Sequence, residues 1–127
     1  MTSKKIIQTG NAPAAIGPYS QAVLVDNTLY CSGQICLDPT TGTLVNDNIT
    51  AETEQVMQNI GAVLESAGMS YEHVVKASIF MRDMDDYGAI NGVYAKFFED
   101  KPPAREAVAV KTLPKLVGVE ISVIAVK

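Results

Sequence analysis

The strongest constraint on the fold is a change of apolar period near the middle of the chain. From Thr50 to Gly68 apolar residues recur every three or four positions, which predicts an amphipathic helix. Thr50 is the expected N-cap and Gly68 the expected residue just past the helix. The apolar stripe of this helix is Val56, Ile60, Val63, Leu64 and Ala67.

Strand-like segments surround this helix, and a second helical pattern follows it. Thr28 to Ile35 is typical of a strand with a glycine interruption, and Asp38-Pro39 with Gly42 supplies turn chemistry after it. The second half predicts a strand at Val74–Arg82, a helix at Asp86–Glu99, and strands at Ala104–Thr112 and Val117–Val126. The second helix has the stripe Tyr87, Ile90, Tyr94, Phe97 and Phe98, has Asn91 on or beside that stripe, and ends before Pro102-Pro103.

This order of elements favours an α+β fold with two helices on one face of a single sheet. The last strand, VGVEISVIAV, has apolar residues on both faces, and Ile124 and Val126 lie on the face that the two helices cannot cover. An uncovered apolar face is typical of a subunit interface, so we expect a homo-oligomer.

Length and charge narrow the class of protein. The 127 residues suit one domain, 1–127, with a core that needs neither disulfide nor metal. The net charge of −4 makes nucleic acid an unlikely partner. No apolar run is long enough to span a membrane, and the absence of an N-terminal signal favours the cytoplasm. Cys31 and Cys36 are interpreted as reduced structural thiols.

Two charged residues sit among small neighbours in the last two strands. Arg105 shares a strand face with Ala107 and Ala109, and Glu120 lies between Gly118 and Ser122 on its own face. A tight turn at Pro114-Lys115 would place Glu120 opposite Ala109, on the same side of the sheet as Arg105 and roughly 13 Å from it. A structural salt bridge, a ligand site and ordinary solvated edge charges all remain open, and the two residues could also meet across a subunit boundary.

If these residues form a ligand site, its chemistry is narrow. An arginine fork grips a carboxylate through two hydrogen bonds, and a nearby glutamate can orient or deprotonate water. Tyr19 and Ser32 follow loop-like residues and could add hydroxyl contacts, although such hydroxyls are more often structural. The residues alone therefore indicate a small-carboxylate site on an oligomeric α+β domain.

Six colinear segments resemble the RidA family, also called YjgF or L-PSP endoribonuclease. They are AIGPYSQAV (15–23), LYCSGQI (29–35), FMRDMDDY (80–87), INGVYAKFF (90–98), PPAREAVAVKTLPK (102–115) and VEISVIA (119–125). The resemblance implies a chorismate-mutase-like fold with a mixed sheet, and a homotrimer with sites between subunits. It also implies hydrolytic deamination of reactive 2-enamine and 2-imine acids to 2-oxo acids and ammonia, with no cofactor and no metal.

The resemblance also assigns roles residue by residue. Arg105 looks like the substrate-carboxylate clamp, and Glu120 looks like the residue that holds the attacking water. Tyr19, Ser32, Gly33 and Asn91 resemble pocket residues. The family often has cysteine where this chain has Ala107, so a thiol-based role is in doubt, while the backbone carbonyl of Ala107 could still hold water.

Two rival functions remain at this point. The first is an endoribonuclease or translation inhibitor, against which the acidic pI of about 4.8 speaks. The second is a non-catalytic sensor of 2-oxo acids or amino acids, which would use the same arginine.

Overall fold

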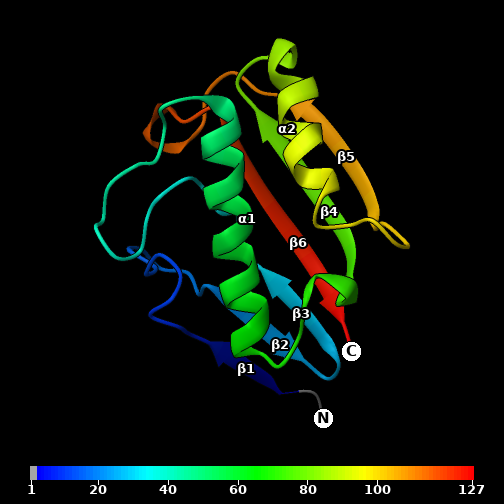
Figure 1. Ribbon diagram of the computed structural model, residues 1–127. Helices are drawn as coiled ribbons and strands as arrows, with labels where there is room; N and C mark the ends of the chain where they lie inside the picture. The colour runs from blue at the N-terminus through cyan, green and yellow to red at the C-terminus, as the bar shows by residue number, and fades with distance from the viewer. Residues whose placement is uncertain (1–2) are drawn as a thin grey trace.

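The computed structural model describes residues 3–127 and, over that range, has two α-helices packed on one face of a six-stranded sheet (Figure 1). The spatial order of the strands is β1-β2-β3-β6-β4-β5, and every neighbouring pair is antiparallel except β4 and β5, which are parallel. The predicted α+β class and mixed sheet are confirmed. The strands are β1 (Lys4–Ile7), β2 (Ala22–Val25), β3 (Thr28–Cys31), β4 (Val74–Met81), β5 (Ala104–Ala109) and β6 (Val119–Val126).

The long helix α1 spans Ile49–Ser66 and buries four residues of the predicted stripe, Val56, Ile60, Val63 and Leu64. The fifth, Ala67, is the C-cap residue and is partly buried. Its N-cap is Asn48 rather than Thr50, because the Asn48 side chain accepts a hydrogen bond from Ala51 N at 2.8 Å. The prediction for the other end is confirmed: Gly68 has a φ of 74°, and its N–H donates to Glu65 O. Glycine adopts this left-handed backbone without steric cost.

The second helix, α2 (Tyr87–Ala95), is shorter than predicted. After Ala95 the N–H groups of Lys96, Phe97 and Phe98 donate to carbonyls three residues back, so the chain leaves the helix through tighter turns. The helix connects β4 to β5, and this crossover lets the two strands run parallel (Figure 1). The strand β5 thereby becomes an edge of the sheet.

The predicted pairing of the last two strands is wrong. The strand β4 lies between β5 and β6, with Phe80 paired to Glu120 on one side and to Val108 on the other. The connection contains a 3-10 turn, Pro114–Leu116, in which Lys115 and Leu116 have positive φ of 54° and 58°. It joins strands that are not neighbours in the sheet, so Glu120 does not face Ala109.

The two faces of the sheet differ in cover. The face under α1 and α2 holds the core, including Leu29, Ile79, Ile121 and Val123, which are at most 2% exposed. The other face carries no helix in residues 3–127, and there Tyr30, Val108 and Val126 are 50%, 42% and 41% exposed. An open face with apolar residues on it is what the last strand predicted.

Candidate functional site

Arg105 is held by helix α2. In the sheet Arg105 pairs with Ala77 of β4, and the side chain of Ala77 faces the helices. The guanidinium of Arg105 contacts Tyr87 and Asn91, which lie one helical turn apart on α2. Nη1 donates to Asn91 Oδ1 at 2.7 Å, and Nη2 donates to Tyr87 Oη at 2.6 Å. The guanidinium carbon lies 5.0 Å from the ring centroid of Tyr94 and 5.6 Å from that of Tyr87. These contacts orient the fork and add cation–π attraction.

This arginine lines a hollow of about 450 Å³, here called the Arg105 cleft, which is bounded by Asn91, Tyr94, Ala95, Phe98, Pro102, Pro103 and Arg105. A guanidinium has five N–H donors. The two hydrogen bonds to α2 occupy two of them, and no others are found within residues 3–127, so three donors remain. That is enough for bidentate capture of a carboxylate.

Glu120 lies in a second hollow of about 520 Å³, here called the Glu120 cleft. Its polar lining includes Tyr19, Ser32, Gly33 and Lys115 as well as Glu120. The Glu120 carboxylate is half-buried, and burial raises its pKa above the usual range. Among the described residues it has neither a hydrogen-bond donor nor a cation within salt-bridge distance. An unpartnered, desolvated carboxylate of this kind is suited to hold water and accept its proton.

The loop residues of the Glu120 cleft are positioned by backbone contacts. The strand β3 ends at Cys31, and Gln34 resumes pairing with Ile121 of β6, which fits the predicted glycine interruption. The Ser32 hydroxyl donates to Ser20 O at 2.6 Å, so its oxygen can only accept from a ligand. Tyr19 is 53% exposed.

Arg105 and Glu120 lie on opposite faces of the sheet. Glu120 pairs with Phe80 and alternates with the buried Val119 and Ile121, so it points away from the helices. Arg105 points toward α2, and Ala107, paired with Ile79, shares its face. The prediction that both charges share one side is therefore wrong. Within one chain, Arg105 contacts Asn91. Glu120 lines a cleft with Tyr19, Ser32 and Gly33. These two groups of predicted site residues do not meet within one chain.

Sequence reasoning missed the residues that support these sets. It placed Tyr87 in an apolar stripe, although a tyrosine four residues before Asn91 could have been read as a polar pair. It did not consider Asn59, whose Nδ2 donates to Ile35 O at 3.0 Å and Leu37 O at 2.9 Å and ties that wall of the Glu120 cleft to α1.

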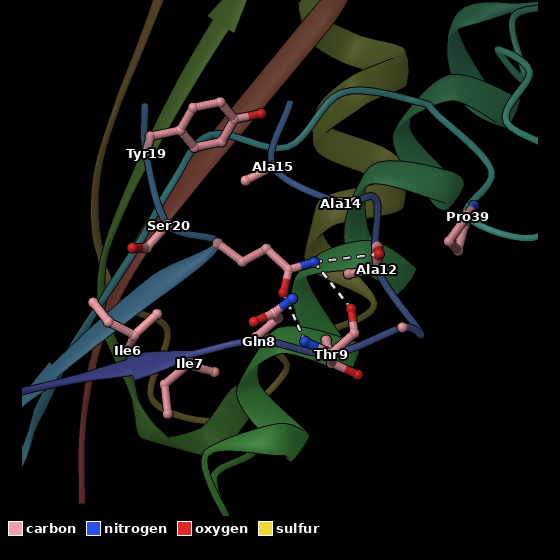
Figure 2. Close-up of a pocket in the computed structure, with 12 residues that line it drawn as sticks. Ile6, Ile7, Gln8, Thr9, Ala12, Ala14, Ala15, Tyr19, Ser20 and Pro39 are labelled. Atoms are coloured by element: carbon pink, nitrogen blue, oxygen red, sulfur yellow. Dashed lines mark hydrogen bonds between the residues drawn. The ribbon is translucent and has the colours of Figure 1, made fainter. Parts of the chain in front are cut away.

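Gln21 supports the opposite wall. This side chain is 3% exposed, donates from Nε2 to the carbonyls of Thr9, Ala12 and Pro13, and accepts from Thr9 N at 2.7 Å. Figure 2 shows Thr9 and Ala12 on these hydrogen bonds, beside a hollow of about 450 Å³ that shares Tyr19 with the Glu120 cleft. Gln21 thereby fixes the chain from Thr9 to Pro13, just before the cleft residue Tyr19.

The cysteines and acids give no further site. Cys31 and Cys36 are free, and burial raises their pKa values to about 12 and about 11, so both thiols stay protonated at neutral pH. Over residues 3–127, no three His, Cys, Asp or Glu side chains are grouped closely enough to hold a metal ion.

No helix in that same range is both long and apolar enough to cross a membrane.

The fold and the two clefts define a small α+β domain with an oriented arginine in one cleft, a half-buried carboxylate in the other, and a sheet that is open on one face. Comparison with known proteins then places it. The sequence model of the family described as Endoribonuclease L-PSP matches residues 9–127. The chain belongs to this family, which is the RidA/YjgF family that the six segments resemble.

Three relatives illustrate the range of the family. A goat (Capra hircus) protein named 2-iminobutanoate/2-iminopropanoate deaminase is 49% identical, over 98% of this chain and 90% of its own. The crystal structure of RidA from an Antarctic Psychrobacter is 45% identical with a TM-score of 0.93, over 97% of this chain and 99% of its own. Escherichia coli TdcF with bound serine is 38% identical with a TM-score of 0.93, over 97% and 98% of the two chains.

Proposed function

We propose that this protein is an enzyme that hydrolyses reactive 2-enamine and 2-imine acids, such as 2-iminopropanoate and 2-iminobutanoate, to 2-oxo acids and ammonia. The observation that carries the proposal is Arg105, oriented by α2 with three N–H donors left for a carboxylate. The deaminase name of a relative 49% identical over 98% of the chain supports the same activity. The serine bound to TdcF, a small amino acid, fits a site of this size and charge.

The complete site is assembled from two copies of the chain. The Arg105 cleft and the Glu120 cleft lie on different faces, so joining them requires contact between two different surfaces of identical chains. Such head-to-tail contacts close into a ring, and the resemblance to RidA proteins favours three members. The exposed apolar residues of the open face, Tyr30, Val108 and Val126, support burial of that face in the ring. Each subunit is one chorismate-mutase-like domain over 1–127, and the trimer acts in the cytoplasm.

The reaction begins with orientation of the substrate. Arg105 of one subunit binds the carboxylate through two N–H donors, and Asn91 keeps the fork in place. From the neighbouring subunit, Tyr19, Ser32 and Gly33 contact the substrate around its imine group. Because the Ser32 proton is already given to Ser20 O, the Ser32 oxygen accepts from the substrate N–H.

Hydrolysis follows by addition of water to C2. Glu120 and the carbonyl of Ala107 hold the water, and Glu120 removes one proton as the oxygen bonds to C2. With the substrate as the protonated imine, the product of this step is a neutral carbinolamine. Glu120 returns its proton to the nitrogen, the C–N bond breaks as the hydroxyl proton passes to Glu120, and ammonia and the 2-oxo acid leave. Positioning and modest acid–base help suffice for an imine that already hydrolyses in water.

Coupling to a serine or threonine dehydratase tests the activity. Semicarbazide traps the free imine, so an active enzyme increases 2-oxo acid at the expense of semicarbazone. We expect the wild-type protein to do so and Arg105→Ala to fail, with equal circular dichroism for the two. Absence of acceleration by the wild-type protein would contradict the proposed activity.

The second candidate is a non-catalytic sensor of small carboxylates, because the same arginine cradle serves binding without turnover. A sensor would show a rise in melting temperature with 2-oxo acids that depends on Arg105, and no acceleration in the trapping assay.

A further inference from the structure

The guanidinium of Arg105 is held only by neutral groups. Its two hydrogen-bond acceptors are an amide oxygen, from Asn91, and a phenol oxygen, from Tyr87. The ion pairs found among the described residues are Lys76–Glu106 and Lys96–Glu54, and neither involves Arg105. The cation is therefore oriented without being neutralised.

This difference matters for a residue that must bind a carboxylate. An aspartate or glutamate beside Arg105 would take the bidentate edge of the fork and cancel its charge. An amide or a phenol accepts one N–H and leaves the full positive charge. The half-buried position strengthens the remaining attraction, since a charge in a partly dry cleft is less screened than one in water.

Tyr87 supplies one of the two points that fix the plane of the fork. Tyr87 and Asn91 are four residues apart on α2, so they present acceptors side by side, one to each Nη atom. With a single acceptor the guanidinium could turn about that contact, whereas two acceptors hold it against rotation. Tyr94 contributes a ring face 5.0 Å away, and its hydroxyl makes no hydrogen bond to Arg105.

We propose that Tyr87 is a positioning residue whose hydroxyl oxygen orients the Arg105 fork for the substrate carboxylate. The inference rests on the proposed function, in which Arg105 is the carboxylate clamp. Without this acceptor the guanidinium rotates and Nη2 is hydrated. Ligand binding must then fix the orientation of the guanidinium again, which lowers the affinity. The loss falls equally on bound substrate and transition state, so KM rises while kcat is preserved.

Removal of the one hydroxyl tests the inference. Tyr87→Phe keeps the ring and its place on α2, and we expect KM for 2-iminobutanoate to rise about tenfold, with kcat changed by less than about twofold. The dissociation constant of 2-oxobutanoate, measured by calorimetry, should rise by the same factor. This binding measurement is independent of turnover, so it tests the inference even if the wild-type protein proves inactive in the trapping assay.

Tyr71→Phe is the matched control. Tyr71 Oη donates to Met57 O, also at 2.6 Å, and Tyr71 itself lines neither cleft. Its ring packs edge-on against Phe98 of the Arg105 cleft, and the phenylalanine keeps that ring. This variant should lower the melting temperature and leave KM and the dissociation constant unchanged. If Tyr87→Phe behaves like Tyr71→Phe, the hydroxyl of Tyr87 is structural and the inference is wrong.

The Arg105→Lys background separates action through Arg105 from direct contact with the ligand. A lysine has no fork to orient, so adding Tyr87→Phe there should change the dissociation constant of 2-oxobutanoate by less than about twofold. An equal loss in both backgrounds would mean that Tyr87 acts without Arg105, which overturns the proposal. Failure of the wild-type protein to bind 2-oxobutanoate at all would also overturn it.

Discussion

Gly33 lies directly against the carboxylate of Glu120. A Cβ at position 33 would be 2.8 Å from Glu120 Cδ, closer than real Cβ atoms approach other heavy atoms, and 3.0 Å from Cγ. The atoms in the way belong to the end of a flexible side chain rather than to backbone. A side chain at position 33 would therefore displace the carboxylate before it displaced the loop.

Gly33→Ala should separate activity from stability for this reason. We expect kcat in the trapping assay to fall at least tenfold, because the displaced Glu120 no longer holds water at the substrate. The free energy of unfolding should fall by only about 1 kcal/mol, the usual scale for one crowded contact with room to relax. Gly10→Ala is the control, since nothing lies within 4 Å of its Cβ, and it should leave kcat unchanged. Full activity in Gly33→Ala would show that the position of this carboxylate does not matter.

Glu120→Gln should cost activity and improve stability at neutral pH. Burial raises the pKa of Glu120 in the folded protein, so the native state holds this proton more tightly than the unfolded chain does. The charged form is therefore unfavourable in the fold, and stability falls as pH rises through the interval between the unfolded pKa and the folded one. The neutral glutamine avoids that loss.

The difference in melting temperature between Glu120→Gln and wild type should accordingly be positive at pH 7. It should shrink as pH falls through the raised folded pKa and vanish below about 4.3, the value for an unfolded glutamate. Melting curves of the two proteins from pH 4 to pH 8 measure it. A difference that is constant with pH would indicate that the charge of Glu120 is not the cause.

The sequence predicted the elements of this fold better than their neighbours in the sheet. Spacing placed α1, because Val56, Ile60 and Leu64 recur with the helical period and are completely buried. It also located α2, although that helix ends at Ala95 rather than at Glu99. The pairing of β5 with β6 failed, because adjacent strands joined by a short link were assumed to form a hairpin. The crossover through α2 instead brings β5 beside β4, and the residues of β5 do not indicate which strand will be its neighbour in the sheet.

The same limit applies to the site. Arg105 and Glu120 were identifiable as charges among small residues, and the motif resemblance assigned each a role. The face that each occupies depends on strand register, and a different partner strand changed the relative placement of the two. The contact between Gln21 and the Thr9–Pro13 segment also had no sequence signal, since it joins residues that only the folded loop brings together.

Asn91→Asp should weaken carboxylate binding even though the new side chain has the same shape. The aspartate would still accept from Arg105 Nη1, and more strongly, but it would cancel the charge that the ligand needs. We expect the dissociation constant of 2-oxobutanoate to rise about tenfold or more, a loss typical of a charge-assisted hydrogen bond. The melting temperature should stay equal or rise. Tighter binding by this variant would contradict the role given to neutral acceptors.

Leu116→Gly should stabilise the protein. Leu116 has a φ of 58°, in the left-handed region that an L-residue enters only at a cost of about 1 kcal/mol, and its side chain is 75% exposed. Glycine removes the steric cost, so the free energy of unfolding should rise by about 0.5–1 kcal/mol, read from denaturant titration. Leu116→Ala keeps the strained backbone and should give no gain. A loss of stability in both variants would mean that this leucine packs against a neighbouring subunit, and a loss in Leu116→Gly alone would contradict the argument from backbone strain.

Two inactive variants should restore activity when they share an oligomer. Arg105 and Glu120 point to opposite faces of one sheet, so a working site takes the arginine from one chain and the glutamate from another. Arg105→Ala supplies an intact Glu120, and Glu120→Gln supplies an intact Arg105. Either variant alone forms only defective sites.

Coexpression of the two variants in equal amounts predicts how much of the wild-type activity should return. With random mixing around a ring, about a quarter of the sites combine an intact arginine with an intact glutamate, so about a quarter of wild-type activity should return. The double variant Arg105→Ala/Glu120→Gln mixed with wild type gives the reference for dilution, because it forms the same proportion of intact sites. If the coexpressed single variants stay inactive while this reference is active, both residues of a site come from one chain, and the proposed assembly from two copies is wrong.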